Sequence, residues 1–305
     1  MDSRIVFMGT PDFAVPSLVK LAEGFQVVGV ITQPDRPSGR GRKLVPSPVK
    51  HAALEHGLEV FQPENANTEN SLQKIREWDP DLICVAAYGQ ILKPPLLDLP
   101  QFGCINVHAS LLPRWRGASP ISAAILHDDS QTGVTIMQMG PGLDDGPILA
   151  QESIDILADE TAGSLSDRLA DLGGKLLAAT IPLYVGGNIS PRIQDHSFTT
   201  YAPQLKKSAG ELNFDLSAES LARTVRAFSP WPGTFTFWKE LRLIIHQARA
   251  VSVTSPGAGV LTVYDGYPAI GTSAGILVLD QLQLAGKNKT AGSAFINGNP
   301  DWKSK

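Results

Sequence analysis

The stretch CINVHASLLPRWRGASP, residues 104–120, joins a strand-like segment to a polar, aromatic loop. The apolar run from Ile105 to Val107, which carries Asn106, predicts a buried strand that ends at His108. Side chains alternate along a strand, so Asn106 and His108 point to the same side. Two leucines and a proline follow, and then the basic, aromatic run Arg114–Arg116. An amide and an imidazole at a strand's carboxyl end indicate a binding crevice, because open α/β sheets place their sites there.

The segments before and after this stretch predict an α/β fold. Short buried strands are predicted at residues 4–9, 26–32, 58–63, 80–89 and 104–110. Helical spacing is found at residues 15–24, 47–57, 69–78 and 164–187. Residues 132–140 and 146–156 resemble an antiparallel pair that ends the sheet. This alternation favours an open, mostly parallel sheet with flanking helices.

The last third of the chain has a different pattern. Residues 186–207 are rich in Gly, Pro, Ser and Thr and lose the helical period, which predicts a linker. A helix at 209–228 and several short strands after it predict a smaller, OB-like β-barrel. We therefore expect a first domain over 1–188, a linker over 189–207 and a second domain over 208–305. Within AFSPWPGTF, Trp231 is expected to be a buried packing residue rather than a base-stacking surface.

The composition and the cysteine content of the chain indicate which broad class of protein it belongs to. The chain has 305 residues, 43% hydrophobic and 18% charged, which is ordinary for a soluble protein of two domains. It shows neither a secretory segment nor an apolar window of membrane-spanning length, so we expect a cytoplasmic protein. Cys84 and Cys104 lie in apolar runs and are expected to be free, buried thiols.

The formal charge of −4 argues against indiscriminate coating of nucleic acid, but it leaves room for a local basic surface. Five positive charges and no acidic residue lie between Arg36 and Lys50. By itself such a run is most often a solvated loop. Gly39 and Gly41 on either side of Arg40 favour a loop that orders on a phosphate backbone.

Several common sites are not indicated. Gly9 ends the first strand without the three spaced glycines of a dinucleotide-binding turn, and no phosphate loop is present. The six histidines lie apart, and the closest pair, His51 and His56, does not share a helix face, so no metal is expected.

Asp144, in the glycine-rich stretch GPGLDDGP, adds a carboxylate to the amide of Asn106 and the imidazole of His108. These three groups suit acid–base and oxyanion chemistry without a Ser or Cys nucleophile. A loop-capping turn at Asp144 remains an alternative. For Arg114 and Arg116, positive charge at the mouth of a cleft and internal salt bridging are equally open.

The stretch NVHASLLPRWRGASPI resembles the Asn-x-His-x-Ser-Leu-Leu-Pro motif of formyltransferases that use 10-formyltetrahydrofolate. Nearly the whole chain is similar to the methionyl-tRNA formyltransferase family, through MGTPDFAVPSL, TQPDRPSGRGRKLVPSPVK, VAAYGQILK, TGVTIMQMGPGLDDG and VRAFSPWPGTF. The resemblance implies a Rossmann-like formyltransferase domain and formyl transfer from 10-formyltetrahydrofolate to initiator methionyl-tRNA. The products would be N-formylmethionyl-tRNA for translation initiation and tetrahydrofolate. It also implies a monomer without a metal.

The same resemblance implies roles for individual residues. The catalytic residues it implies are Asn106, His108 and Asp144. The folate-binding residues it implies are Ser110, Leu111, Leu112, Pro113, Tyr88 and Gly89. The tRNA-binding residues it implies are Arg40, Arg42 and Lys43. The family more often has Asp-Thr-Gly-Asp where this chain has Asp144–Pro147, so Asp145 and Pro147 put the path of that loop in question.

Rival functions remain at this stage. A related enzyme could formylate a sugar-nucleotide amine or a purine precursor, or release formate by hydrolysis. A tRNA-binding protein on the same scaffold needs no catalysis, but Asn106, His108 and Asp144 are all present. The basic loop and the second domain favour the tRNA substrate.

Overall fold

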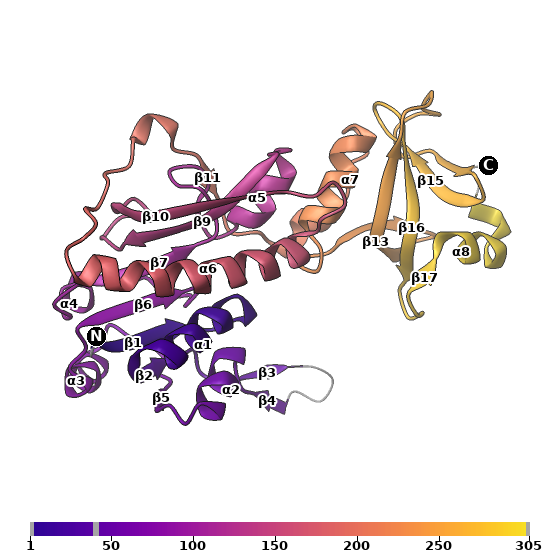
Figure 1. The fold of residues 1–305 in the computed structure, drawn as a ribbon. Coiled ribbons are helices and arrows are strands. Elements are labelled where there is room, and N and C mark those ends of the chain that lie inside the picture. Colours follow the sequence, from indigo (N-terminus) through magenta and orange to yellow (C-terminus); the bar gives the residue numbers. More distant parts are fainter. Residues whose placement is uncertain (1–2, 39–42, 303–305) are drawn as a thin grey trace. The chain divides into compact units, whose positions relative to one another are not determined.

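Seven strands form the larger sheet of the computed structural model, which describes residues 3–38 and 43–302. Their order across the sheet is β10-β9-β7-β6-β1-β2-β5 (Figure 1). The parallel strands are β1 (Arg4–Gly9), β2 (Gln26–Ile31), β5 (Val60–Phe61), β6 (Leu82–Ala86) and β7 (Cys104–His108). The antiparallel strands are β9 (Gln131–Gln138) and β10 (Ile148–Asp155). The predicted α/β sheet and its closing antiparallel pair are thus confirmed.

Helices cover both faces of this sheet, which is why its central strands are continuous apolar runs. They are α1 (Val15–Gly24), α2 (Pro48–Glu55), α3 (Glu69–Trp78), α4 (Pro94–Leu97) and α6 (Ala162–Val185). In β1, Ile5 to Met8 are fully buried. Val6 and Met8 belong to one core with Trp78 of α3 and Leu96 of α4.

The other face carries α6, which lies along the sheet in Figure 1. A Cβ at Gly173 would lie 2.7 Å from Val107 Cγ1 of β7. One at Gly174 would lie 2.8 Å from the carbonyl oxygen of Pro16 in α1. This glycine pair therefore lets α6 approach both the sheet and α1 closely.

Two of these helices, α2 and α3, begin with side-chain caps. Ser47 Oγ accepts a hydrogen bond from Lys50 N at the start of α2. Thr68 Oγ1 accepts from Ser71 N at the start of α3. Each cap pairs an otherwise unpaired N–H of the first turn.

A smaller, antiparallel sheet follows, in the order β12-β13-β16-β15-β14 with β17 beside β16. Its strands are β12 (Thr234–Trp238), β13 (Leu241–Val251), β14 (Leu261–Tyr264), β15 (Tyr267–Gly271), β16 (Ile276–Leu284) and β17 (Thr290–Ala291). Helices α7 (Ala218–Ala227) and α8 (Gly292–Gly298) pack on its strands. Helix α5 (Pro120–Leu126) precedes β9 in the chain. The predicted smaller β domain is found as this antiparallel sheet.

The last residues that the structure describes complete the smaller core. Trp302 is 1% exposed, and its ring lies 5.6 Å from that of Trp238 and 5.5 Å from that of Phe295. Aromatic pairs at these separations contribute about 0.5–1.5 kcal/mol each beyond burial of area.

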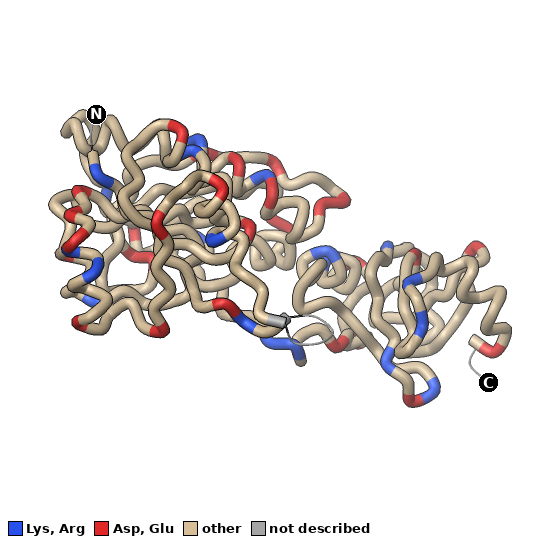
Figure 2. The backbone as a smooth tube through the Cα atoms, turned by 90° about the horizontal axis from the view of Figure 1, so that it is seen from below, with Lys and Arg blue, Asp and Glu red and all other residues tan. Residues whose placement is uncertain are grey.

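The contacts divide the chain into two compact units. The first comprises Met1–Pro120, Gln131–Asp155 and Ser166–Ala202, and the second comprises Ile121–Ser130, Ile156–Leu165 and Pro203–Lys305. Residues 189–202 therefore pack on the first unit, and the domain bounds at 188 and 208 stay predictions. Figure 2 shows basic and acidic residues interspersed along the backbone of each unit.

The expectation of a buried Trp231 was wrong, because its side chain is 50% exposed. Phe228, at 5% exposure, is the aromatic residue that the corner buries. Pro230 instead lies against Gly163, where a Cβ would be 3.0 Å from Pro230 Cδ. The tryptophan is thus left on the outer side of the turn.

The basic hairpin consists of β3 (Arg36–Ser38) and β4 (Lys43–Val45), which pair antiparallel. Of the predicted tRNA-binding residues, Arg40 and Arg42 lie outside the described residues, and Lys43 is described only by its backbone in β4. Within the described parts of the chain, no helix has the length and hydropathy of a membrane span.

Candidate active site

The carboxyl ends of β1, β6 and β7 meet at one edge of the larger sheet. Gly9 of β1 pairs with Ala86 of β6. After β6 the backbone turns through Ala87 and Gly89, both with positive φ. Thr10 Oγ1 donates a hydrogen bond to the carbonyl oxygen of Tyr88 at 3.0 Å. This contact fixes the turn after β6 against the end of β1, beside the end of β7.

His108 lies at this edge and is 5% exposed. Its Nε2 lies 2.9 Å from the carbonyl oxygen of Trp115, which can only accept, so Nε2 carries the hydrogen. Its Nδ1 lies 3.7 Å from Asp144 Oδ2. The ring is therefore held on one side, and its other nitrogen faces a carboxylate.

Asn106 is half-buried and precedes His108 on the same side of β7. Its side-chain amide makes no hydrogen bond with the part of the chain that the structure describes. Cys104 also shares that side of the strand by alternation. Cys104, Asn106 and His108 thus form a row, with neighbours about 7 Å apart at 3.3 Å per residue.

Asp144 reaches this row from the loop between β9 and β10. Its backbone has φ +47°, a left-handed conformation that is uncommon outside Gly, Asn and Asp. Its Oδ2 accepts a hydrogen bond from Gly117 N at 2.8 Å. The carboxylate oxygen that faces His108 is therefore fixed by the backbone of a second loop.

The loop departs from the family pattern at Asp145 and Pro147, and both residues have a place in it. The carboxylate of Asp145 lies where a Cβ on Gly142 would be, 2.1 Å from Oδ2. The carbonyl oxygen of Pro147 accepts from Gln138 N at 2.9 Å. The loop closes back onto β9, and Asp144 still faces His108.

The segment Ser110–Pro113 is held largely by internal hydrogen bonds. Ser110 Oγ donates to the carbonyl oxygen of Arg114 at 2.6 Å. Thr135 Oγ1 donates to the Ser110 carbonyl at 2.6 Å and accepts from Leu112 N at 3.1 Å. Ser110 and Leu112 are buried, whereas Leu111 and Pro113 remain partly exposed.

Tyr88 and Gly89, which follow β6, differ in their exposure. Tyr88 is 2% exposed, and its hydroxyl has no hydrogen-bond partner among the described residues. Burial raises the pKa of Tyr88 to about 12. Gly89 is exposed, with open space where a Cβ would be. Tyr88 and Gly89 therefore offer mainly backbone groups to a bound molecule.

The two arginines of the aromatic loop differ as well. The Arg114 guanidinium lies 4.2 Å from the centre of the Trp115 ring, and Arg114 is exposed. Arg116 is 3% exposed, and its Nε and Nη2 donate to Gln194 Oε1 at 3.1 and 2.7 Å. Arg116 is thus turned inward, but its side-chain partners among the described residues are an amide and, at 3.3 Å, His196 Nδ1 rather than an acid.

Residues 192–202, which we call the strap, run along both loops of the site. The backbones of Arg192 and Ile148 exchange two hydrogen bonds of 2.8 Å. Thr200 Oγ1 accepts from Trp115 N at 2.9 Å. The strap ends in β11 (Tyr201–Ala202), which pairs with β8 (Arg116–Gly117). Sequence reasoning missed the strap, because an irregular polar segment has no periodic signal.

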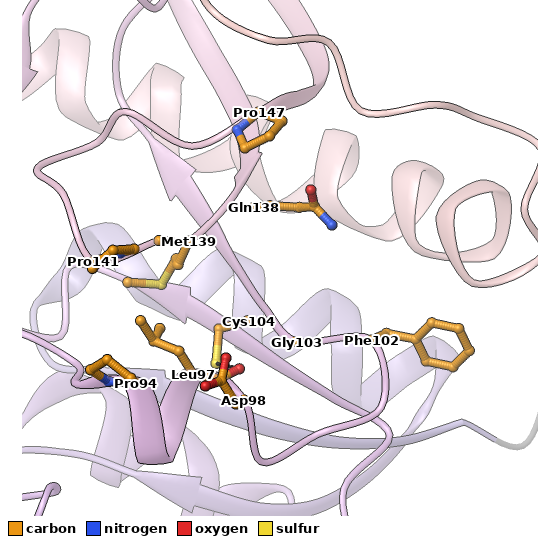
Figure 3. A pocket seen from close by; sticks show the side chains of 11 residues that line it. Pro94, Leu97, Asp98, Phe102, Gly103, Cys104, Gln138, Met139, Pro141 and Pro147 are labelled. Carbon is orange, nitrogen blue, oxygen red and sulfur yellow. Dashed lines mark hydrogen bonds between the residues drawn. The ribbon is translucent and has the colours of Figure 1, made fainter.

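A hollow of about 430 Å³ opens beside the Asp144 loop (Figure 3). Gly140, Pro141 and Pro147 of that loop form one part of its wall. The other lining residues are Pro94, Leu97, Asp98, Phe102, Gly103, Cys104, Gln138 and Met139. None of the three predicted catalytic side chains lines it, but Cys104 begins the row that leads to His108.

Burial raises the pKa of the Cys104 thiol to about 12 and that of Cys84 well above its usual range.

No group of three or more His, Cys, Asp or Glu side chains within residues 3–38 and 43–302 is arranged to hold a metal ion.

Comparison with known proteins gives two matches to family models. The model described as formyl transferase matches residues 3–181, and that described as formyl transferase, C-terminal domain, matches residues 204–300.

Individual relatives agree. The methionyl-tRNA formyltransferase of Marinobacter nauticus is 47% identical over 300 residues, which cover 97% of this chain and 96% of that protein. That of Halorhodospira halophila is 49% identical over 301 residues, covering 98% and 97%. Among solved structures, an N-formyltransferase from Helicobacter canadensis in complex with folinic acid and dTDP-3-aminofucose has a TM-score of 0.64. It is 18% identical and covers 94% of this chain and 100% of that one, a likeness of fold.

Proposed function

The chain belongs to the methionyl-tRNA formyltransferase family, and from that premise we propose how its residues carry out formyl transfer. It transfers a formyl group from a folate to the α-amino group of methionyl-tRNA. We propose 10-formyltetrahydrofolate as the donor and the initiator tRNA as the acceptor. The observation that supports this best is the arrangement of the Asn106 amide, the His108 ring and the Asp144 carboxylate at one sheet edge.

The substrate supplies its own nucleophile. An α-amino group has a pKa of about 7.7–8.0 in model compounds, so part of it is neutral near pH 7. Such an amine needs positioning more than activation. A site without a Ser or Cys nucleophile is therefore sufficient.

The formyl oxygen gains negative charge as the amine attacks, and Asn106 is placed to stabilise it. Its amide has no hydrogen-bond partner among the described residues, so its N–H groups are available to a substrate oxygen. Removal of one such donor typically costs about 100- to 1,000-fold in rate.

His108 and Asp144 are proposed to move the proton that the attacking amine loses to N10 of the folate, whose bond to the formyl carbon breaks. Nε2 is engaged by Trp115, so Nδ1 is the ring atom that can hold or pass a proton. Its 3.7 Å separation from Asp144 Oδ2 exceeds a hydrogen bond and leaves room for Nδ1 to approach a reacting group. The carboxylate would keep the ring in that orientation.

The folate would lie along the row on β7. The hollow has the volume of a small-molecule site and walls of Leu97, Met139 and several prolines. A flat pterin placed there, against Cys104, would put its reactive end near Asn106, about 7 Å along the strand. The bound folate supplies the activated formyl group.

The predicted folate residues would then divide into two groups. Leu111 and Pro113 would offer side-chain surface, and Tyr88 and Gly89 would offer backbone groups. Ser110 and Leu112 would act by fixing the shape of their loop.

The tRNA would contact the basic hairpin. We propose that Arg40, Arg42 and Lys43 contact phosphates of the acceptor stem, as the resemblance implies. We also propose that the protein acts as a monomer in the cytoplasm, where charged tRNA is made.

The test is transfer of label from 10-formyltetrahydrofolate to charged initiator methionyl-tRNA, with the unaltered protein, His108→Ala and His51→Ala compared. His51 is a matched control, because its side chain is 69% exposed on α2. We expect label on the tRNA, a loss of at least 100-fold in His108→Ala and no loss in His51→Ala. Folate turnover without labelled tRNA would indicate a hydrolase or a transferase for a small amine. Binding of tRNA without folate chemistry would indicate a binding protein.

A further inference from the structure

Gln194 of the strap connects the two loops that form the catalytic site. It is 3% exposed although its neighbours on both sides are exposed. Its Nε2 donates to the carbonyl oxygens of Asp144 at 2.9 Å and Gly146 at 2.7 Å. Its Oε1 accepts two hydrogen bonds from Arg116. Both ends of the amide are therefore engaged with the site.

These contacts close a ring around Asp144. Gly117 N holds the Asp144 carboxylate, while Arg116, its neighbour in sequence, holds Gln194, which in turn holds the Asp144 backbone. The side chain and the main chain of Asp144 are thus positioned by the same dipeptide, once directly and once through Gln194.

The Asp144 backbone needs such support. A left-handed residue other than glycine persists where the surrounding structure determines it. The Asp144 and Gly146 carbonyls each accept a hydrogen bond from Gln194, and loss of that amide would leave both without this donor. The charge of Arg116 also polarises the amide and strengthens its donation, because hydrogen bonds in a chain reinforce one another.

We infer that Gln194 is a positioning residue for catalysis, which holds the Asp144 carboxylate at the reach of His108 by clamping the 144–146 backbone. This inference rests on the proposed function, since it takes Asp144 to act in formyl transfer. Gln194 itself touches no reacting atom.

The first variant is Gln194→Met, which keeps the length of the side chain and removes all four hydrogen bonds. Displacement of a catalytic group by about 1 Å can cost about 100-fold. We expect kcat to fall about 10- to 100-fold, with KM for folate and for methionyl-tRNA changed less than about threefold. Ile193→Ala is the matched control, because the side chain is 80% exposed next to Gln194 in the strap, and it should retain full kcat.

The decisive measurement repeats Gln194→Met in an Asp144→Asn background. If Gln194 acts through the Asp144 carboxylate, the second substitution changes kcat by less than about threefold there, because the two effects are not additive. A full 10- to 100-fold further loss in that background would overturn the inference. So would a Gln194→Met single variant with unaltered kcat.

Gln194→Glu covers the case in which the methionine variant does not fold. It keeps the acceptor for Arg116 but turns a carboxylate toward two carbonyl oxygens, so we expect a similar loss of kcat. Full activity of this variant would also overturn the inference. Asp144→Asn alone distinguishes failure of the proposed function from failure of the inference. Full activity of this variant would remove the proposed role of Asp144, and the inference about Gln194 with it. A slow Asp144→Asn beside a fast Gln194→Met removes the inference only.

Discussion

Thr135 of β9 is the hydrogen-bonding centre of the Ser110–Pro113 segment, and its replacement by valine tests how that segment is held. Thr135 Oγ1 donates to the Ser110 carbonyl and accepts from Leu112 N and, at 3.0 Å, from Gln151 Nε2. Thr135 is fully buried and lies opposite His108 in the sheet. Valine has nearly the same shape, so Thr135→Val removes these bonds without opening a cavity.

The expected loss of stability follows from the buried polar groups that lose Thr135 Oγ1 as their partner. The Leu112 N–H and the Ser110 carbonyl each lose this partner, whereas the Gln151 amide keeps its bond to the Leu112 carbonyl. An unpaired buried polar group costs about 1–3 kcal/mol, so two of them predict a loss of about 2–6 kcal/mol in the free energy of unfolding.

Thr132, three residues earlier on the same strand, provides the matched control. It is 3% exposed, and its hydroxyl has no hydrogen-bond partner within the described residues. Thr132→Val removes a buried polar group that nothing pairs, so we expect stability to be unchanged or higher by up to about 1 kcal/mol.

Urea unfolding of both variants, followed by tryptophan fluorescence and circular dichroism, measures the difference. We expect the midpoint of the transition that reports the first unit to fall for Thr135→Val and to stay or rise for Thr132→Val. Equal midpoints for the two variants, or the reverse order, would refute the hydrogen-bond reasoning.

The remaining predictions concern the site and its substrates. Asn106→Ala should lower kcat about 100- to 1,000-fold with little change in KM for methionyl-tRNA, measured at saturating folate; a large KM effect with normal kcat would contradict a role in stabilising the formyl oxygen. Arg40→Ala and Arg42→Ala should each reduce the slope of log affinity for tRNA against log salt by about 1, as titrations at several salt concentrations would show, and an unchanged slope would place the tRNA elsewhere. Cys84 and Cys104 should resist alkylation by iodoacetamide at pH 8 in the folded protein and react after unfolding, because burial raises the pKa of both thiols and keeps them protonated; mass spectrometry showing rapid modification of the folded chain would contradict this.

The sequence predicted the larger sheet well for a physical reason. Strands of a parallel sheet are covered on both faces, so residues such as Ile5–Met8 and Leu82–Ala86 read as unbroken apolar runs. The pairing of Asn106 with His108 on one side of β7 needed only the alternation of side chains along a strand. Both features depend on residues close together in the chain.

Other features depend on contacts that local patterns do not encode. The approach of Asp144 to His108 joins residues 36 positions apart. The residues alone left it open against a loop-capping turn at Asp144, and the resemblance to a family favoured it. Trp231 was predicted to be buried because large aromatic residues usually are, but Phe228 fills that place. The strap read as a linker, because its backbone bonds go to other segments and leave no pattern in its own sequence.

The site therefore combines residues that can be predicted from the sequence with residues that cannot. An asparagine and a histidine on one strand and an aspartate in a loop stand out because their side chains can do chemistry. Gln194 does not stand out, because a side-chain amide that pairs two carbonyls can come from any segment that passes nearby. Yet the position of Asp144 depends on both of its loop partners, Gly117 through the carboxylate and Gln194 through the backbone. Since transfer rates depend on distances of about an ångström, a residue that carries no chemistry can still control the rate.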